Sequence, residues 1–198
     1  MQRRQVLQGI GLSTLGLLAV PPQAFALGGT LPELGQAAPA FDLHGVAPSG
    51  VGSDGVAVPA HLTLAGFAGD WLVLYFYPRD FTEGCTLEAR GFQRDLSQFQ
   101  QAGAQVVGIS ADDPDSHAEF CGSESLAFPL LSDPGGVVSR AYGSWIAPFS
   151  QRHSFLIDPQ GILRASWLAV RPARHSQEVL AELRRLQAAG TPADAPFG

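Results

Sequence analysis

Cys85 is the residue best placed to do chemistry in this chain, because its thiol lies between an apolar run and a helical pattern. Residues 71–77 (WLVLYFY) form the apolar run, Pro78 closes it, and a helical spacing of apolar residues begins near Glu83. A sulfur at the start of a helix faces unpaired backbone N–H groups and the positive end of the helix dipole, and both favour a thiolate. We therefore expect Cys85 to be a nucleophile.

The neighbours of Cys85 are mostly polar. Some of them shape the approach to its sulfur, and others oppose ionisation of its thiol. Thr82 puts a hydroxyl three residues before the sulfur, and Pro78 removes a backbone donor from the approach to it. Glu83 and Glu88 are anions that oppose a thiolate, so the folded chain must supply a cation if Cys85 is to ionise. These polar neighbours also argue against Cys85 as a small packed hydrophobe, a common role of free cysteine.

Predicted strands and helices alternate along the segments that hold these residues. Continuous or alternating apolar runs predict strands near residues 41–43, 57–64, 71–77, 105–111 and 128–131, and an Asp158-Pro159-Gln160-Gly161 turn predicts a later hairpin. Helical spacing predicts helices over residues 83–102, from Pro114 with Asp113 as N-cap, over 134–142 and over 173–189. The predicted fold is α/β and thioredoxin-like: a mixed central sheet flanked by helices, with an N-terminal hairpin extension.

The residues around Cys85 also carry a resemblance to a known family. Pro78, Thr82 and Cys85 form P-x-x-x-T-x-x-C after an apolar strand, which resembles the active-site signature of the peroxiredoxins. The segment LYFYPRDFTEGCTLEA is similar to the peroxiredoxin Q, or bacterioferritin comigratory protein, branch. The likeness continues in FPLLSDPGGVVSRAYG, RHSFLIDPQGILR and HSQEVLAEL and spans roughly residues 34–186. It implies a thiol-dependent peroxidase for hydrogen peroxide and organic hydroperoxides that needs no metal and no cofactor.

The resemblance implies a role for each matching residue. Cys85 matches the peroxidatic cysteine, which becomes sulfenic acid on attacking a peroxide. Thr82 matches the hydroxyl that positions the peroxide, and Pro78 the residue that shields the pocket. Arg152 matches the arginine that stabilises the thiolate and the leaving oxygen, and Glu88 an acidic residue that orients this arginine. Arg152 would thus be the cation that the acidic neighbours of Cys85 require.

The chain departs from the branch at the second thiol. Many members carry a resolving cysteine five residues after the first, but that position is Arg90 here. Some members resolve with a cysteine in the helix where Cys121 lies, so the resemblance makes Cys121 a candidate resolving residue through an intramolecular disulfide. That disulfide would require local unfolding, which Gly122 beside it makes easier. The alternatives are that Cys121 packs in the core and that an external thiol resolves Cys85.

The first residues of the chain read as an export signal. Arg3 and Arg4 precede an apolar, glycine-broken stretch that ends in Ala24-Phe25-Ala26, which predicts a signal peptide over residues 1–26 of twin-arginine type. An uncleaved N-terminal anchor is the alternative. We expect a single domain over residues 27–189, a flexible tail over 190–198, and location in the periplasm or thylakoid lumen, with no stable membrane insertion after cleavage.

Composition and absent motifs narrow the classes of function. The net charge of −6 argues against nucleic-acid binding. The chain has no C-x-x-C motif, which disfavours a thiol–disulfide oxidoreductase. It has no glycine-rich phosphate loop, which disfavours a nucleotide cofactor. Its five histidines do not have the spacing of metal ligands. The expected partners are a peroxide and a thioredoxin or thioredoxin-like reductant, and the expected assembly is a monomer or weak dimer. The alternative function is a non-enzymatic thiol redox sensor or binding protein on the same fold.

Overall fold

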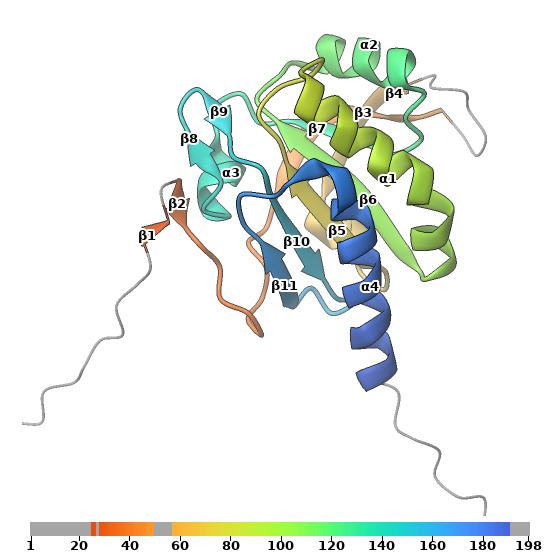
Figure 1. Cartoon of the computed structure of the whole chain (residues 1–198). Helices are drawn as coiled ribbons and strands as arrows, with labels where there is room; N and C mark the ends of the chain where they lie inside the picture. Colours follow the sequence, from red (N-terminus) through yellow and green to blue (C-terminus); the bar gives the residue numbers. More distant parts are fainter. Residues whose placement is uncertain (1–24, 27, 50–56, 191–198) are drawn as a thin grey trace, which may run out of the picture.

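The computed structural model describes residues 25–26, 28–49 and 57–190, and Figure 1 shows their arrangement. The predicted export signal lies outside the described residues except for Phe25–Ala26, as does the predicted tail beyond Gly190. Within the described ranges, no helix is both long and apolar enough to cross a membrane.

The described elements follow the predicted alternation of strands and helices. The helices are α1 (Glu83–Gln101), α2 (Pro114–Glu124), α3 (Val137–Ala141) and α4 (Pro172–Gly190), with a 3₁₀ turn η1 (Leu64–Phe67). The strands are β1 (Phe25–Ala26), β2 (Gly29–Thr30), β3 (Asp42–Pro48), β4 (Ala57–Thr63), β5 (Trp71–Phe76), β6 (Ala104–Ser110), β7 (Leu130–Ser132), β8 (Trp145–Ile146), β9 (Phe149–Ser150), β10 (His153–Ile157) and β11 (Leu163–Trp167).

Seven strands form one mixed sheet in the order β11-β10-β5-β6-β7-β3-β4. Strands β5, β6 and β7 run parallel, while β10 and β11 on one side and β3 and β4 on the other are antiparallel. The mixed sheet with flanking helices confirms the predicted thioredoxin-like class. The predicted N-terminal hairpin is β3–β4, and it joins the sheet by pairing with β7.

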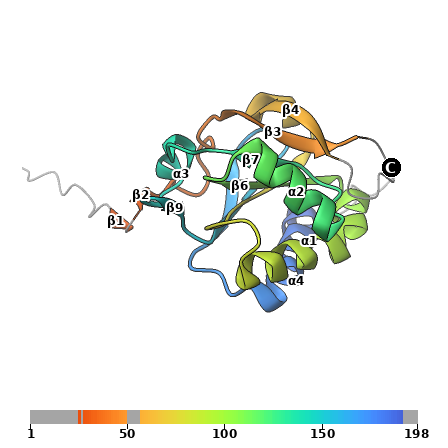
Figure 2. The same cartoon turned by 90° about the horizontal axis from the view of Figure 1, so that it is seen from above.

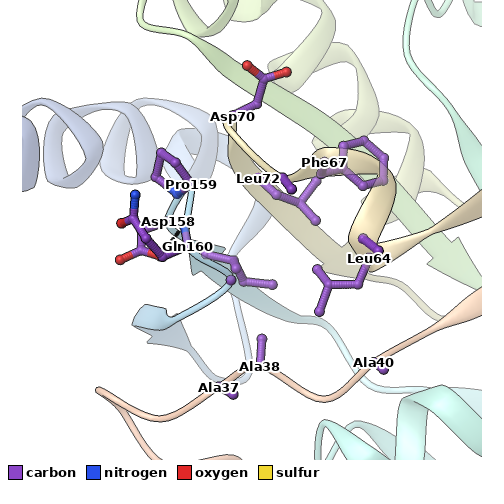
Figure 3. Close-up of a pocket in the computed structure, with 14 residues that line it drawn as sticks. Ala37, Ala38, Ala40, Leu64, Phe67, Asp70, Leu72, Asp158, Pro159 and Gln160 are labelled. Atoms are coloured by element: carbon purple, nitrogen blue, oxygen red, sulfur yellow. Dashed lines mark hydrogen bonds between the residues drawn. The ribbon is translucent and has the colours of Figure 1, made fainter.

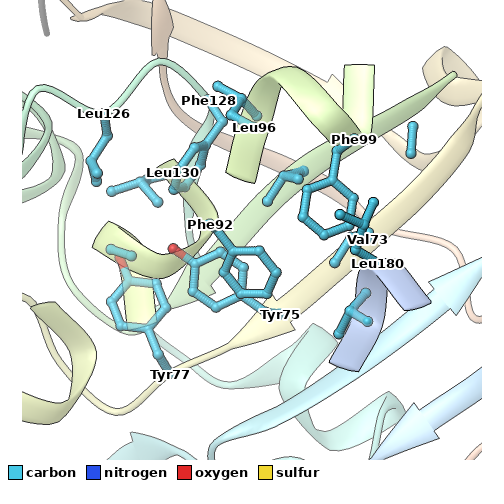
Figure 4. Close-up of a cluster of buried hydrophobic side chains, with 14 of the residues drawn as sticks. Val73, Tyr75, Tyr77, Phe92, Leu96, Phe99, Leu126, Phe128, Leu130 and Leu180 are labelled. Carbon is cyan, nitrogen blue, oxygen red and sulfur yellow. The ribbon is translucent and has the colours of Figure 1, made fainter. Parts of the chain in front are cut away.

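Alternating residues of β5 enter two separate cores, as a strand covered on both faces requires. Val73, Tyr75 and Tyr77 point to the face covered by α1, α2 and α4, where they pack with aromatic residues such as Phe92 (Figure 4). The intervening side chains point to the other face, which α3 covers: Leu72, Leu74 and Phe76. Figures 1 and 2 show α1 and α4 side by side along the sheet.

Two boundaries differ from the predicted ones for local reasons. Strand β7 starts at Leu130 and not at Phe128, because Pro129 has no N–H to donate and only its carbonyl accepts, from Gly108. Helix α3 starts at Val137, three residues later than predicted, because the Asp133 carboxylate accepts hydrogen bonds from the first amides of that helix.

Candidate active site

Cys85 lies in the first turn of α1, directly after the loop that follows β5. Thr82 is the N-cap residue, and the amide of Thr86 donates the first helical hydrogen bond to its carbonyl at 2.9 Å. The amides of residues 83–85 therefore lack helical acceptors and give the site a positive electrostatic character. Cys85 itself is only 2% exposed, so its sulfur is shielded from bulk water.

Strand register brings Arg152 to Cys85 from 67 residues away. Strand β10 pairs antiparallel with β5, with His153 opposite Phe76, so Arg152 falls beside the loop that β5 enters. Its Nη2 donates a hydrogen bond to Cys85 Sγ at 3.2 Å. The structure thus supplies the cation that the acidic sequence around Cys85 requires.

Gly84 and the start of α4 shape the space around this guanidinium. A Cβ built on Gly84 would lie 3.0 Å from Arg152 Nη2 and 3.9 Å from Pro172 Cγ. A larger residue at position 84 would therefore crowd the arginine away from the sulfur. Since Pro172 begins α4, the N-terminus of a second helix also lies at the site and adds to its attraction for an anion.

Glu88 holds the other arm of the Arg152 guanidinium. Its side chain is buried, and Oε2 accepts a hydrogen bond from Arg152 Nη1. Burial raises the pKa of Glu88 to about 7, against the lowering effect of Arg152. The pKa of Arg152 is raised, because the attraction of Glu88 and Cys85 outweighs its own burial. The guanidinium therefore stays charged between two acceptors, as its fork geometry allows.

The buried carboxyl of Glu88 predicts a pH dependence of stability. Because its pKa rises from 4.5 to about 7 on folding, the folded state holds this proton longer than the unfolded state. The free energy of unfolding should therefore fall as pH rises from about 4.5 to 7, by on the order of 3 kcal/mol. Denaturant unfolding of wild type and Glu88→Gln at pH 5 and pH 7 measures this; equal pH slopes in the two proteins would contradict it.

Thr82 and Pro78 lie on the loop that leads into α1. The Thr82 side chain does not cap the helix; its Oγ1 donates to the carbonyl of Arg79 at 3.0 Å. The donor is thus engaged while the oxygen lone pairs stay available, so this hydroxyl is set to accept a hydrogen bond. Pro78 is half-buried directly after the last residues of the strand.

Cys121 lies on α2 and is 1% exposed. Both cysteines are free, and no disulfide joins them. Burial, and next the charge of Asp80, raise the pKa of the Cys121 thiol to about 12. In this packed state Cys121 is a neutral thiol, and the nucleophilic form would require α2 to open.

Sequence reasoning missed a buried polar cluster beside the site. Asp80, on the loop between Pro78 and Thr82, bonds to Tyr77, Ser116 and His117. The only local signal was that His117 falls one helical turn before Cys121, on the apolar face of a predicted helix.

A separate hollow lies at the other end of β5 (Figure 3). It is mostly apolar and is lined by Leu64, Phe67, Leu72 and Ile157, with Asp158 and Gln160 at its edge. None of the predicted site residues lines it. Across the described ranges, no group of three or more His, Cys, Asp or Glu is arranged to hold a metal ion.

Residues 34–166 match the family model described as "AhpC/TSA family", a span that includes Cys85 and Arg152. The chain belongs to the AhpC/TSA family. This peroxiredoxin is 40% identical over 131 residues to Peroxiredoxin Bcp of Xanthomonas campestris, covering 62% of the chain and 81% of that protein. It is 36% identical over 156 residues to the chloroplastic Peroxiredoxin Q of Populus jackii, covering 77% and 68%.

Solved structures place this peroxiredoxin in the same branch. A cysteine-to-serine mutant of Xylella fastidiosa PrxQ superposes with a TM-score of 0.70 at 30% identity, covering 80% of this chain and 99% of that one. The Xanthomonas campestris bacterioferritin comigratory protein, described for its alkyl peroxide reduction activity, gives a TM-score of 0.65 at 33% identity, covering 74% and 91%. The predicted peroxiredoxin Q and Bcp branch is confirmed.

Proposed function

We propose that this peroxiredoxin is a thiol-dependent peroxidase that reduces hydrogen peroxide and organic hydroperoxides at Cys85. The observation that carries the proposal is the bond from Arg152 Nη2 to Cys85 Sγ at 3.2 Å, with Glu88 holding the other arm of the guanidinium. That arrangement stabilises both a thiolate and a negatively charged leaving oxygen in a site shielded from water. The Xanthomonas campestris bacterioferritin comigratory protein, described for its alkyl peroxide reduction activity, supports the same reaction.

The first step oxidises the sulfur by two electrons. The Cys85 thiolate attacks the terminal oxygen of the peroxide, an S–O bond forms and the O–O bond breaks, leaving sulfenic acid. The alkoxide or hydroxide that departs takes up a proton and leaves as an alcohol or water. Arg152 faces this developing charge with a permanently charged group, so no reorganisation is needed as the bond breaks.

The loop residues set the direction of approach. Thr82 Oγ1 donates to Arg79, so it receives the O–H of a hydroperoxide on its lone pairs and turns the terminal oxygen toward the sulfur. Pro78 shields the sulfur from one side and offers no competing N–H. Glu88 acts through Arg152 as an orienting residue.

The second step returns the sulfenic acid to a thiol by way of a disulfide. Either Cys121 or an external thiol attacks the Cys85 sulfur, an S–S bond forms, and the sulfenic oxygen leaves as water with the thiol proton. A thioredoxin or thioredoxin-like dithiol then reduces the disulfide and is itself oxidised. No metal or organic cofactor takes part in this cycle.

A Cys121→Ser variant tests the second step. We expect single-turnover oxidation of Cys85 to persist, while thioredoxin-supported turnover falls at least about tenfold, because the intramolecular thiol has a high effective concentration. Peroxide consumption under thioredoxin and thioredoxin reductase measures turnover, and non-reducing mass spectrometry after one equivalent of peroxide measures the Cys85–Cys121 bridge. Unchanged turnover would assign resolution to an external thiol.

The same assay separates an enzyme from the redox sensor considered above. An enzyme consumes many equivalents of peroxide per Cys85, whereas a sensor stops after one.

The proposal extends to location and assembly: export by residues 1–26 to the periplasm or thylakoid lumen, and a monomer or weak dimer. The paired arginines Arg3 and Arg4 support export; cell fractionation that finds the protein only in the cytoplasm would overturn it.

A further inference from the structure

We propose that Asp80, Ser116 and His117 form a buried latch that holds α2 closed over Cys121 and limits the rate of disulfide formation with oxidised Cys85. The proposal rests on the function proposed above, since it concerns the second step of that cycle. It makes Ser116 and His117 positioning residues for Cys121. The alternative is that these residues only stabilise the fold.

The latch joins the loop that precedes Cys85 to the helix that carries Cys121. Asp80 is 4% exposed, and its carboxylate accepts from Ser116 Oγ at 2.8 Å, from His117 Nδ1 at 2.9 Å and from Tyr77 Oη at 2.7 Å. A carboxylate only accepts, so Nδ1 of His117 carries the proton. Two of the three donors belong to the first turns of α2, so α2 cannot unwind there without leaving a buried carboxylate under-bonded.

His117 is fully committed to this contact. The side chain has no exposed surface, and its Nε2 has no hydrogen-bond partner in the described part of the protein. The polar contacts of the ring are therefore made through Nδ1, which lies 2.9 Å from Asp80 Oδ2 and 3.4 Å from Tyr77 Oη. Because the carboxylate of Asp80 is the closer acceptor, loss of this bond removes the main polar contact of the His117 side chain.

Residues after β6 hold both sides of the latch, the loop that carries Asp80 and the first turn of α2. The backbone amide of Asp80 donates to Asp112 Oδ2 at 2.9 Å, and Ser110 Oγ donates to the same oxygen at 2.7 Å. The first turn of α2 is capped by Asp113, which accepts from the amide of Ser116. The loop after β5 and the start of α2 thus form one fixed unit.

Cys121 lies one turn after His117 on the same buried face of α2. While the latch is closed, the sulfur is surrounded by core residues and lies within the field of Asp80. Opening of α2 would move the Cys121 sulfur away from the core residues and from the charge of Asp80. The closed helix therefore keeps Cys121 buried and neutral until α2 opens.

A second contact holds the other end of α2 but is much more exposed. Arg90 Nε and Nη2 donate to the two oxygens of Glu124 at 2.5 and 3.2 Å, and the Arg90 side chain is 65% exposed. The Glu124 side chain is only 12% exposed, but solvent around the guanidinium screens the pair and lowers its contribution to stability. The buried contact around Asp80 is therefore the one expected to govern opening, although Arg90 occupies the position of the usual resolving cysteine.

The test compares four variants on α2. Ser116→Ala and His117→Leu each remove one donor to Asp80, while His117→Asn keeps an amide N–H near the position of Nδ1. Ser123→Ala is the matched control, because its hydroxyl bonds only to the carbonyl of Phe120 in its own helix. Hydrogen exchange of residues 114–124 in the reduced protein reports opening, and rapid-quench mass spectrometry reports the disulfide.

We expect Ser116→Ala and His117→Leu to speed both hydrogen exchange of α2 and disulfide formation by about 10- to 100-fold, the range set by a lost hydrogen bond to a charged group. His117→Asn should restore most of the wild-type rates, and Ser123→Ala should leave them unchanged. Faster resolution should also lower sulfinic acid at high peroxide, since a second peroxide competes for the sulfenic acid.

Wild-type rates of exchange and disulfide formation in both latch variants would overturn the proposal. Equal acceleration by Ser123→Ala would overturn it too, because that result would indicate general loosening of α2. If His117→Leu fails to fold, Ser116→Ala carries the test alone. Absence of any Cys85 sulfenic acid in a Cys121→Ser background would instead refute the proposed peroxidase, and hydrogen exchange would still test the latch.

Discussion

Replacing Cys85 with serine is expected to abolish peroxide reduction, lowering the rate by at least about 10⁴-fold, because a hydroxyl is a far weaker nucleophile than a thiolate at neutral pH. The rest of the site should survive. Serine differs from cysteine by one atom, and Arg152 keeps its contact with Glu88. Peroxide consumption and single-turnover oxidation followed by intact-protein mass spectrometry would measure the loss.

The control for this variant is Cys121→Ser, which removes the other thiol and leaves Cys85 in place. That protein should still form one sulfenic acid per chain, detectable with a dimedone-type reagent. Peroxide turnover by Cys85→Ser above a few per cent of wild type would reject Cys85 as the reacting group. Oxidation of Cys121 in its place is not expected, because burial raises the pKa of its thiol to about 12.

Replacing Arg152 with glutamine is expected to slow the reaction of Cys85 with peroxide by about 10²–10³-fold, the usual cost of removing one group that stabilises transition-state charge. The variant loses the donor to the sulfur and the cation that faces the leaving oxygen. It should still fold, because Glu88 can take up a proton once the guanidinium that lowers its pKa is gone. Stopped-flow kinetics at pH 7 in a Cys121→Ser background isolates this step.

Two further arginine variants sharpen this prediction. Arg152→Lys keeps the charge but loses the two-armed geometry, so an intermediate rate is expected. Arg164→Gln is the matched control, because Arg164 pairs with Asp158 at the opposite end of the sheet from Cys85. A wild-type rate for Arg152→Gln, with melting temperature unchanged, would show that the loop and the helix N-terminus suffice to activate the thiol.

Much of the fold follows from local patterns in the sequence. The apolar run of β5, the helical spacing of α1 and the turn between β10 and β11 each depend on residues close together in the chain, so their types were predictable. The exact starts of some strands and helices depended on single side chains. Pro129 delayed β7 by two residues, and Asp133 set the start of α3 by accepting hydrogen bonds from the first amides of that helix.

Part of the candidate site could likewise be predicted from the sequence, and part could not. The positions of Cys85, Thr82 and Pro78 could be deduced from one strand end and one helix start. The need for a cation followed from Glu83 and Glu88, but its identity came from a family resemblance and not from the physics of the sequence. The structure adds the register that sets His153 opposite Phe76 and so brings Arg152 to the sulfur.

Local patterns in the sequence predict that a thiol begins a helix after a buried strand and that it needs a cation. The surroundings of that thiol come from contacts between parts of the chain that are far apart in sequence. The contacts of Arg152 with Cys85, and of Asp80 with His117, join residues 67 and 37 positions apart. Such contacts depend on strand register and helix packing, which follow from the burial of the whole chain. Local propensity carries no record of them.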